Sequence, residues 1–187
     1  MKTPFVVGTQ IYLRPLKRED LNEKYLSWLN DPEVNRYLES GIFPYTRDEL
    51  ERFYEQATGS SNQVVLAIVD RETDQHIGNV KLGPINWVHR KATLGILVGG
   101  REFWRKGIGT EATRLMVEYG FFRLNLNRID LGVYAEHEAA IRVYEKVGFQ
   151  VEGRFREDLF HEGKFKDRLW MGLLRSEYRP MVEDERA

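Results

Sequence analysis

Two glycines and two basic residues stand together at 105–109, directly before a segment with the pattern of an amphipathic helix. The N–H groups in the first turn of a helix are unpaired and carry the positive end of the helix dipole, so they attract anions. Glycine lets the backbone approach a phosphate closely, and the basic side chains add positive charge. The spacing predicts a pyrophosphate-binding loop made of Arg105, Lys106, Gly107, Ile108, Gly109 and Thr110.

The same glycines also match the dinucleotide fingerprint Gly-x-Gly-x-x-Ala, with Asp130 about twenty residues further on. In that fold a strand leads directly into the first glycine, whereas here the charged segment 101–106 intervenes. The ribose-binding acid should also close the next strand, and Asp130 opens it. An NAD-linked oxidoreductase is therefore a minor alternative. A Walker-type loop is excluded because no Gly-Lys-Ser/Thr occurs.

Length and composition favour one globular domain of 187 residues, with no cysteine and a formal net charge of -1. Without cysteine there is no disulfide, thiolate metal site or catalytic thiol, and we expect a cytoplasmic protein without a metal. The mixed charges argue against nucleic acid as a partner, and no apolar run is long enough for a membrane span.

The elements that must position the glycine loop follow from periodicity and breakers. They alternate as β-αα-βββ-α-β-α-ββ, which predicts a mixed, mostly antiparallel α/β (α+β) sheet of about seven strands with flanking helices. We expect one domain over 1–175 and a charged tail over 176–187. The strands are expected at 5–14, 64–69, 76–82, 92–98, 129–135 and on both sides of a turn at 162–163, and the helices at 19–29, 46–57, after the glycine segment, and at 138–147.

A second motif, Tyr-Ala-Glu-His-Glu-Ala-Ala-Ile-Arg-Val-Tyr-Glu-Lys-Val-Gly-Phe, occupies residues 134–149. Together with the glycine segment it resembles the GNAT family of acyl-CoA-dependent N-acetyltransferases, and the likeness covers residues 10–175. The segment 28–34 with Ile77-Gly78-Asn79 resembles the RimJ/RimL-type branch. This resemblance implies that the pyrophosphate belongs to acetyl-CoA, whose acetyl group an acceptor amine attacks directly in a ternary complex.

The resemblance also implies roles for individual residues. Central parallel strands splay around the pantetheine arm, backbone N–H groups near Leu97 and Val98 hold the thioester carbonyl, and Tyr144 protonates the departing thiolate. His137 and Ala140 share a helix face with Tyr144. The implied cofactor-binding residues beyond the glycine loop are Leu97, Val98, His137, Ala140 and Lys146, and the implied catalytic residues are Tyr144 and His137.

Three positions depart from the pattern of that family. Many relatives carry Glu at the place of Thr93 and Asn at that of His137, and often Gln or Arg at that of Trp104. A threonine is not a useful base near neutral pH. The group that removes the amine proton is left open between a protein base, His137 included, and a chain of waters.

The sequence offers candidate residues for binding the acceptor amine and several acceptor classes. The candidate residues for binding it are Tyr37, Tyr45, Asn79, Glu157 and Asp158. An amino sugar, free or linked to a nucleotide, is our main expectation. A protein N-terminus of the ribosomal type, a polyamine and an aminoglycoside are alternatives, and a non-catalytic CoA-binding module is a rival from another class. The resemblance also allows a homodimer formed through exposed strand edges.

Overall fold

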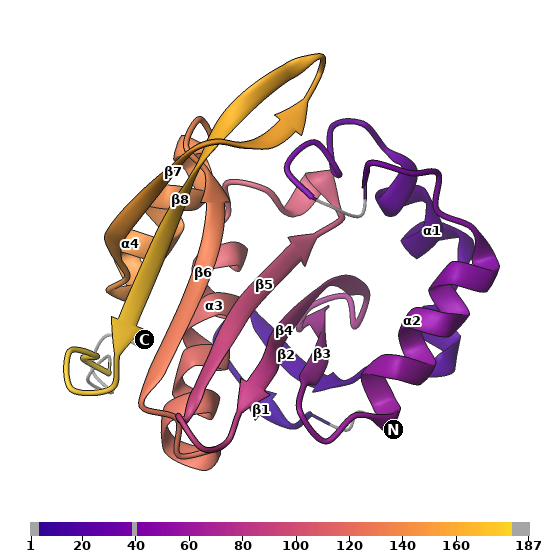
Figure 1. Ribbon diagram of the computed structural model, residues 1–187. Coiled ribbons are helices and arrows are strands. Elements are labelled where there is room, and N and C mark those ends of the chain that lie inside the picture. The colour runs from indigo at the N-terminus through magenta and orange to yellow at the C-terminus, as the bar shows by residue number, and fades with distance from the viewer. Residues whose placement is uncertain (1–3, 39–40, 181–187) are drawn as a thin grey trace.

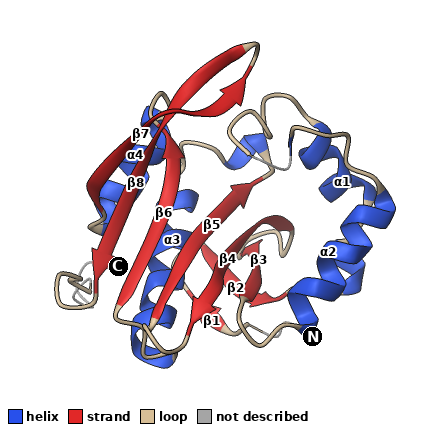
Figure 2. Ribbon diagram, in the orientation of Figure 1, coloured by secondary structure: helices blue, strands red, loops and turns tan. Residues whose placement is uncertain are grey.

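The computed structural model describes residues 4–38 and 41–180 of the chain. They form one eight-stranded sheet with helices on both of its faces (Figures 1 and 2). The strands are β1 (Val6–Val7), β2 (Ile11–Pro15), β3 (Val64–Asp70), β4 (His76–Asn86), β5 (Lys91–Val98), β6 (Arg128–Tyr134), β7 (Gln150–His161) and β8 (Lys164–Leu174). The helices are α1 (Glu23–Asn30), α2 (Arg47–Gly59), α3 (Ile108–Glu118), which continues as a π turn over Tyr119–Arg123, and α4 (Glu138–Val147).

The strands lie in the order β1-β2-β3-β4-β5-β6-β8-β7, and every neighbouring pair is antiparallel except β5 with β6. The parallel ladder joins only residues 91–93 to 128–130. Beyond that point the two strands diverge, as Figure 1 shows. The predicted mixed sheet with splayed central strands is therefore confirmed.

Two strand predictions need correction. The expected strand over 5–14 is two strands, because the chain turns between them: the Gly8 N–H donates to the Ile11 carbonyl at 2.9 Å. The Glu111 carboxylate accepts the Gln10 N–H at 3.0 Å and secures that turn from α3, a tertiary contact without a local signal. The strand expected to end at residue 82 runs on to Asn86, because a register shift between Leu82 and Ile85 absorbs the interruption at 83–84.

The first two helices begin at side-chain caps. Asn22 accepts the Tyr25 N–H at 3.1 Å before α1, and Thr46 forms a reciprocal capping box with Glu49 before α2. The helix expected over 19–29 therefore starts later, after a short 3-10 turn at Arg18–Asp20. Towards the other end of the chain, α4 ends at Val147, where the sequence predicted, and Gly148 closes it in the left-handed conformation at φ 110°.

The core is divided between the two faces of the sheet. The larger cluster lies under α3 and α4 and includes Ile68, Leu82, Met116, Phe121 and Met171. On the opposite face, α1 and α2 pack over β2, β3 and β5. Alternate residues of each central strand therefore face the two helical layers, and the layer of α1 and α2 leaves room over β5 and β6.

After β8 the chain stays packed against the core. Tyr178 is 4% exposed, its ring centroid lies 5.7 Å from that of Phe121 at an interplanar angle of 53°, and its hydroxyl donates a hydrogen bond to Glu118 at 2.9 Å. Residues 181–187 of the predicted tail lie outside the described residues. Within the described part, no helix is both long and apolar enough to cross a membrane, and no three His, Asp or Glu side chains gather as a metal site.

Candidate active site

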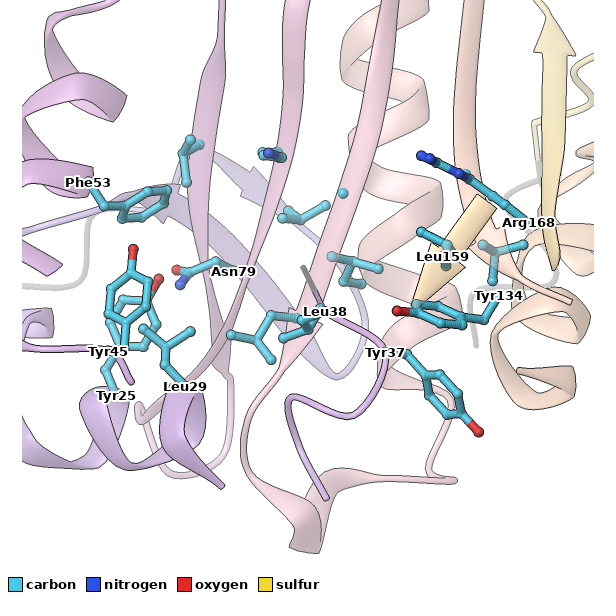
Figure 3. A pocket seen from close by; sticks show the side chains of 18 residues that line it. Tyr25, Leu29, Tyr37, Leu38, Tyr45, Phe53, Asn79, Tyr134, Leu159 and Arg168 are labelled. Carbon is cyan, nitrogen blue, oxygen red and sulfur yellow. The ribbon is translucent and has the colours of Figure 1, made fainter. Parts of the chain in front are cut away.

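A cavity of about 440 Å³ opens where β5 and β6 part. Its walls come from β3, β4, β5 and β6, from α1, α2 and the segment between them, and from the β7–β8 hairpin (Figure 3). Tyr25, Leu29, Tyr45 and Phe53 form one side in that view, and Tyr134 and Arg168 the other. The full lining is Tyr25, Leu29, Tyr37, Leu38, Tyr45, Phe53, Val65, Asn79, Val80, Lys81, Gly95, Ile96, Leu97, Gly132, Val133, Tyr134, Leu159 and Arg168.

Two glycines make room for this cavity on the diverging strands. A Cβ on Gly95 would lie 2.9 Å from Cε of Lys81, and a Cβ on Gly132 would lie 2.7 Å from Cδ of Arg168. The aliphatic stems of both cations thus lie across the glycines and form part of the lining. Arg168 is paired with Asp158, its Nε lying 2.5 Å from the carboxylate.

The glycine loop stands at the start of α3. Gly107 is the N-cap in the left-handed conformation at φ 84°, which only glycine adopts without strain. The N–H groups of residues 108–110 follow in the first turn, where a helix offers no intrahelical acceptor. Arg105 and Lys106 are exposed beside them. A Cβ on Gly109 would lie 3.9 Å from Cγ2 of Val143, so the first turn of α3 lies next to α4.

The opened β5–β6 pair forms part of the cavity wall, and the indole of Trp104, three residues before Gly107, donates a hydrogen bond to Val98 at the end of β5. The chain matches the family described as "Acetyltransferase (GNAT) domain" over residues 10–150. It belongs to the GNAT acetyltransferase family. Spermidine N(1)-acetyltransferase of Escherichia coli K12 is 35% identical over 171 residues, which cover 90% of this chain and 88% of the relative.

A solved structure gives the same family. The crystal structure of spermidine N-acetyltransferase from Vibrio cholerae in complex with CoA and spermine superposes with a TM-score of 0.83 at 31% identity, covering 91% of this chain and 99% of that one. A putative ribosomal N-acetyltransferase of Bacillus subtilis is 35% identical, but only over 54% of this chain and 55% of its own. The comparisons establish the GNAT family and do not single out the RimJ/RimL-type branch.

As a GNAT N-acetyltransferase, the chain is an acyltransferase that uses acetyl-CoA as its co-substrate. Its own residues fit that ligand. The first turn of α3 offers unpaired N–H groups for a pyrophosphate, and Gly109 leaves the approach to them free of a side chain. Beyond residues 93 and 130, β5 and β6 are no longer paired with each other. Among the predicted cofactor residues, Leu97 lines the cavity, Ala140 is partly buried against the core, and Lys146 is exposed.

The predicted general acid, Tyr144, is 9% exposed on the inner face of α4, with its ring 6.0 Å from that of Phe149. Burial raises the pKa of its hydroxyl to about 12, because the ionised form would be poorly solvated. The hydroxyl is therefore protonated throughout the neutral range, as a proton donor must be. Its catalytic role stays a prediction.

His137, predicted to act on the cofactor or the acceptor, precedes the first turn of α4. Its ring stacks on Tyr37 with centroids 4.1 Å apart and an interplanar angle of 20°. Burial lowers its pKa, and Arg36 lowers it further, so the imidazole is neutral near pH 7. The stack connects α4 to the segment after α1, and Tyr37 also lines the cavity.

Thr93 is engaged in holding the sheet together. Its hydroxyl donates to the Asp130 carboxylate at 2.9 Å, at the last paired position before β5 and β6 diverge. Asp130 is 6% exposed and also lies 3.4 Å from Nε of Arg128. The threonine thus joins the two strands where the family base would stand, and Asp130 is a strand-pairing residue.

The other acceptor candidates divide into two groups. Tyr37, Tyr45 and Asn79 line the cavity together. Glu157 does not: it is an exposed residue in the irregular part of β7, and its N–H donates to Asp167 at 2.9 Å. Asp158 also lies outside the lining and reaches the cavity only through its ion pair with Arg168.

Sequence reasoning missed several residues of the site. Tyr25, Lys81, Gly95, Gly132 and Arg168 all line the cavity. The glycines could have been found, since 93, 95 and 97 on one strand and 130, 132 and 134 on the next share a face by period-2 alternation. Trp104 departs from the family pattern but has a structural task, because its indole N–H donates to the Val98 carbonyl at 2.8 Å.

Proposed function

We propose that the acceptor is an aliphatic polyamine of the spermidine class, acetylated on a primary amine. The observation that carries this proposal is the aromatic lining of the cavity, where five rings surround an open space: Tyr25, Tyr37, Tyr45, Phe53 and Tyr134. Aromatic faces accept both methylene groups and protonated amines. The names of the 35% and 31% identical relatives support the same acceptor class.

The attacking amine must be neutral, and the cavity favours that form. Aromatic and aliphatic walls withhold water from an ammonium, and the ammonium of Lys81 adds like-charge repulsion. Both effects lower the pKa of a bound amine. Among the lining residues that the structure describes there is no carboxylate or imidazole, and we expect the chain to assist deprotonation by solvating the charged amine poorly. The acetyl thioester then supplies the electrophile, and Tyr144 donates a proton to the leaving thiolate.

A panel of amines tests this assignment. CoA release would be followed with a thiol reagent, which the cysteine-free protein does not consume. We expect kcat/KM for spermidine and spermine to exceed by at least tenfold, about 1.4 kcal/mol, the values for glucosamine and for a peptide with a free N-terminus. A higher value for the peptide or the amino sugar would overturn the polyamine assignment and leave the acetyltransferase activity intact.

A further inference from the structure

A buried polar chain runs from the cavity wall into the protein behind it. Asn79 of β4 is 7% exposed and lines the cavity (Figure 3). Its Oδ1 lies 3.1 Å from Nε2 of His76, whose Nδ1 lies 3.9 Å from Oδ1 of Asp20. Asp20 in turn accepts two hydrogen bonds from Arg14, at 2.6 and 2.7 Å. Acetyl transfer as described above uses neither His76, Asp20 nor Arg14.

The cavity end of this chain is incomplete. Burial raises the pKa of the Tyr25 hydroxyl and the nearby Asn79 amide lowers it, so these two side chains interact, but no described residue completes a hydrogen bond of good geometry with Nδ2 of Asn79. Leaving a buried amide without a hydrogen bond destabilises the free protein. A ligand that enters the cavity and forms a hydrogen bond with this amide would remove that destabilisation. The amide is therefore a candidate ligand-binding group.

The amide can turn either its oxygen or its nitrogen toward the cavity, because the neutral imidazole beside it can either donate or accept a hydrogen bond. A neutral histidine has one donor and one acceptor nitrogen. When Nε2 of His76 carries the proton, it donates to Oδ1 of Asn79 and leaves Nδ2 for the cavity. When the proton is on Nδ1, facing the Asp20 carboxylate, Nε2 accepts from Nδ2 of Asn79. A half turn of the amide then directs Oδ1 into the cavity.

The imidazole ring itself is held in place. Tyr25 and Trp28 of α1 pack against His76 with ring centroids 5.5 and 5.3 Å away, at interplanar angles of 87° and 63°. The ring therefore keeps Nε2 toward Asn79 and Nδ1 toward Asp20 in both proton arrangements. The variable quantities are the position of one proton and the rotation of one amide.

We propose that Asn79 binds an N–H of the acceptor amine through Oδ1, and that His76 and Asp20 are positioning residues that turn its amide to do so. The inference rests on the amine acceptor proposed above, whose nitrogens supply N–H donors. In the free protein Nε2 of His76 faces Oδ1 of Asn79 and carries the proton. An incoming N–H selects Oδ1 in the cavity, and the proton then moves to Nδ1, where the nearby charge of Asp20 stabilises it. An oxygen ligand would select the opposite orientation of the amide.

Steady-state kinetics of Asn79→Leu tests the binding role, with Asn86→Leu on the exposed end of β4 as the matched control. We expect the acceptor KM to rise at least tenfold in Asn79→Leu while the KM for acetyl-CoA changes by less than twofold. The control should change neither. An acceptor KM within twofold of the wild type would overturn the role of Asn79.

Nitrogen NMR of the wild-type protein tests the positioning role without any substitution at the site. The chain has four histidines, so His76→Gln suffices to assign the resonances of His76. We expect the proton on Nε2 in the free protein and on Nδ1 after CoA and the acceptor are added. An unchanged tautomer in the complex would overturn the role of His76 and Asp20.

These outcomes separate the inference from the function on which it rests. If the wild type acetylates no amine of the panel, the proposed function fails. If it acetylates spermidine or another amine of the panel, Asn79→Leu is measured with that amine. An unchanged acceptor KM would then overturn the inference alone.

Discussion

The Tyr144 hydroxyl is kept protonated by burial, and this allows its role to be tested apart from its packing. We expect Tyr144→Phe to lower kcat by about 10²-fold or more, the usual size of a lost general acid. Affinity for acetyl-CoA should change by less than twofold, because the ring keeps its place beside Phe149. The measurements are single-turnover kinetics and calorimetric titration with acetyl-CoA.

Tyr178→Phe is the control for that variant, since Tyr178 is also buried but packs against Phe121 and donates to Glu118. It should retain the wild-type kcat.

The pKa of about 12 also has a consequence for the pH profile: Tyr144 is protonated below that value, so no alkaline loss of kcat below about pH 10 should come from it. A kcat unchanged in Tyr144→Phe would make Tyr144 a packing residue.

Thr93 offers a second test at the scale of a single side chain. Thr93→Val keeps the volume but removes the hydrogen bond to Asp130, leaving a buried carboxylate with one partner fewer. We expect a loss of about 1–3 kcal/mol in the free energy of unfolding with kcat within a few-fold of the wild type. Urea unfolding and steady-state kinetics measure the two quantities, and Thr58→Val on the surface of α2 is the control.

A hundredfold fall in kcat with unchanged stability would contradict this assignment and make the Thr93 hydroxyl part of the proton path. The distinction matters because the sequence suggested only that Thr93 replaces a carboxylate. The structure adds that the neighbouring strand places the carboxylate of Asp130 beside Thr93. That carboxylate is paired with the Thr93 hydroxyl and with Arg128.

At the scale of elements, a substitution at the start of α3 should change ligand binding without changing the stability of the fold. A Cβ on Gly109 would meet Cγ2 of Val143 at 3.9 Å, an ordinary van der Waals contact, so there is room for the first carbon of a side chain. The added side chain should instead block the approach of the pyrophosphate to the first turn. We expect a loss of at least 100-fold in acetyl-CoA affinity by calorimetry. Gly59→Val at the open end of α2 is the matched control.

The thermal midpoint of Gly109→Val should stay within a few degrees of the wild type, since valine in a helix is no worse than glycine. Normal acetyl-CoA affinity in this variant would remove the phosphate-loop assignment. Gly107 could not serve for the same test, because its φ of 84° strains any other residue and would lower stability as well.

The elements near the glycine loop were predictable because their signals are local. Gly107 marks the start of α3, Gly148 marks the end of α4, and Thr46 caps the start of α2. Each acts through backbone or side-chain geometry within a few residues. The turn at Gly8 was not predictable, because Glu111 holds it from α3. The acceptor cavity was only partly predictable for the same reason: Arg168 and Gly132 meet across a strand pair, and no local pattern reports that contact.

At the scale of the whole molecule, the sheet consists of two halves with a narrow connection. Strands β1–β5 and strands β6–β8 share a ladder of three residue pairs, 91–93 with 128–130, together with the packing of α3. A ligand held between the diverging parts of β5 and β6 contacts both halves at once. We call the boundary between β5 and β6 the seam. Binding should therefore stabilise both halves of the sheet together and slow local opening at the seam.

We expect acetyl-CoA at about 100 times its dissociation constant to add about 2.7 kcal/mol of stability and to raise the thermal midpoint by about 5–10 °C. Hydrogen exchange should slow most at residues 95–98 and 132–134, which flank the seam, and less at β2 and β3, whose ladder is already continuous. NAD should produce neither effect, and Gly109→Val should lose both. Protection confined to α3, with the seam unchanged, would mean that the ligand occupies the glycine loop without bridging the two halves of the sheet.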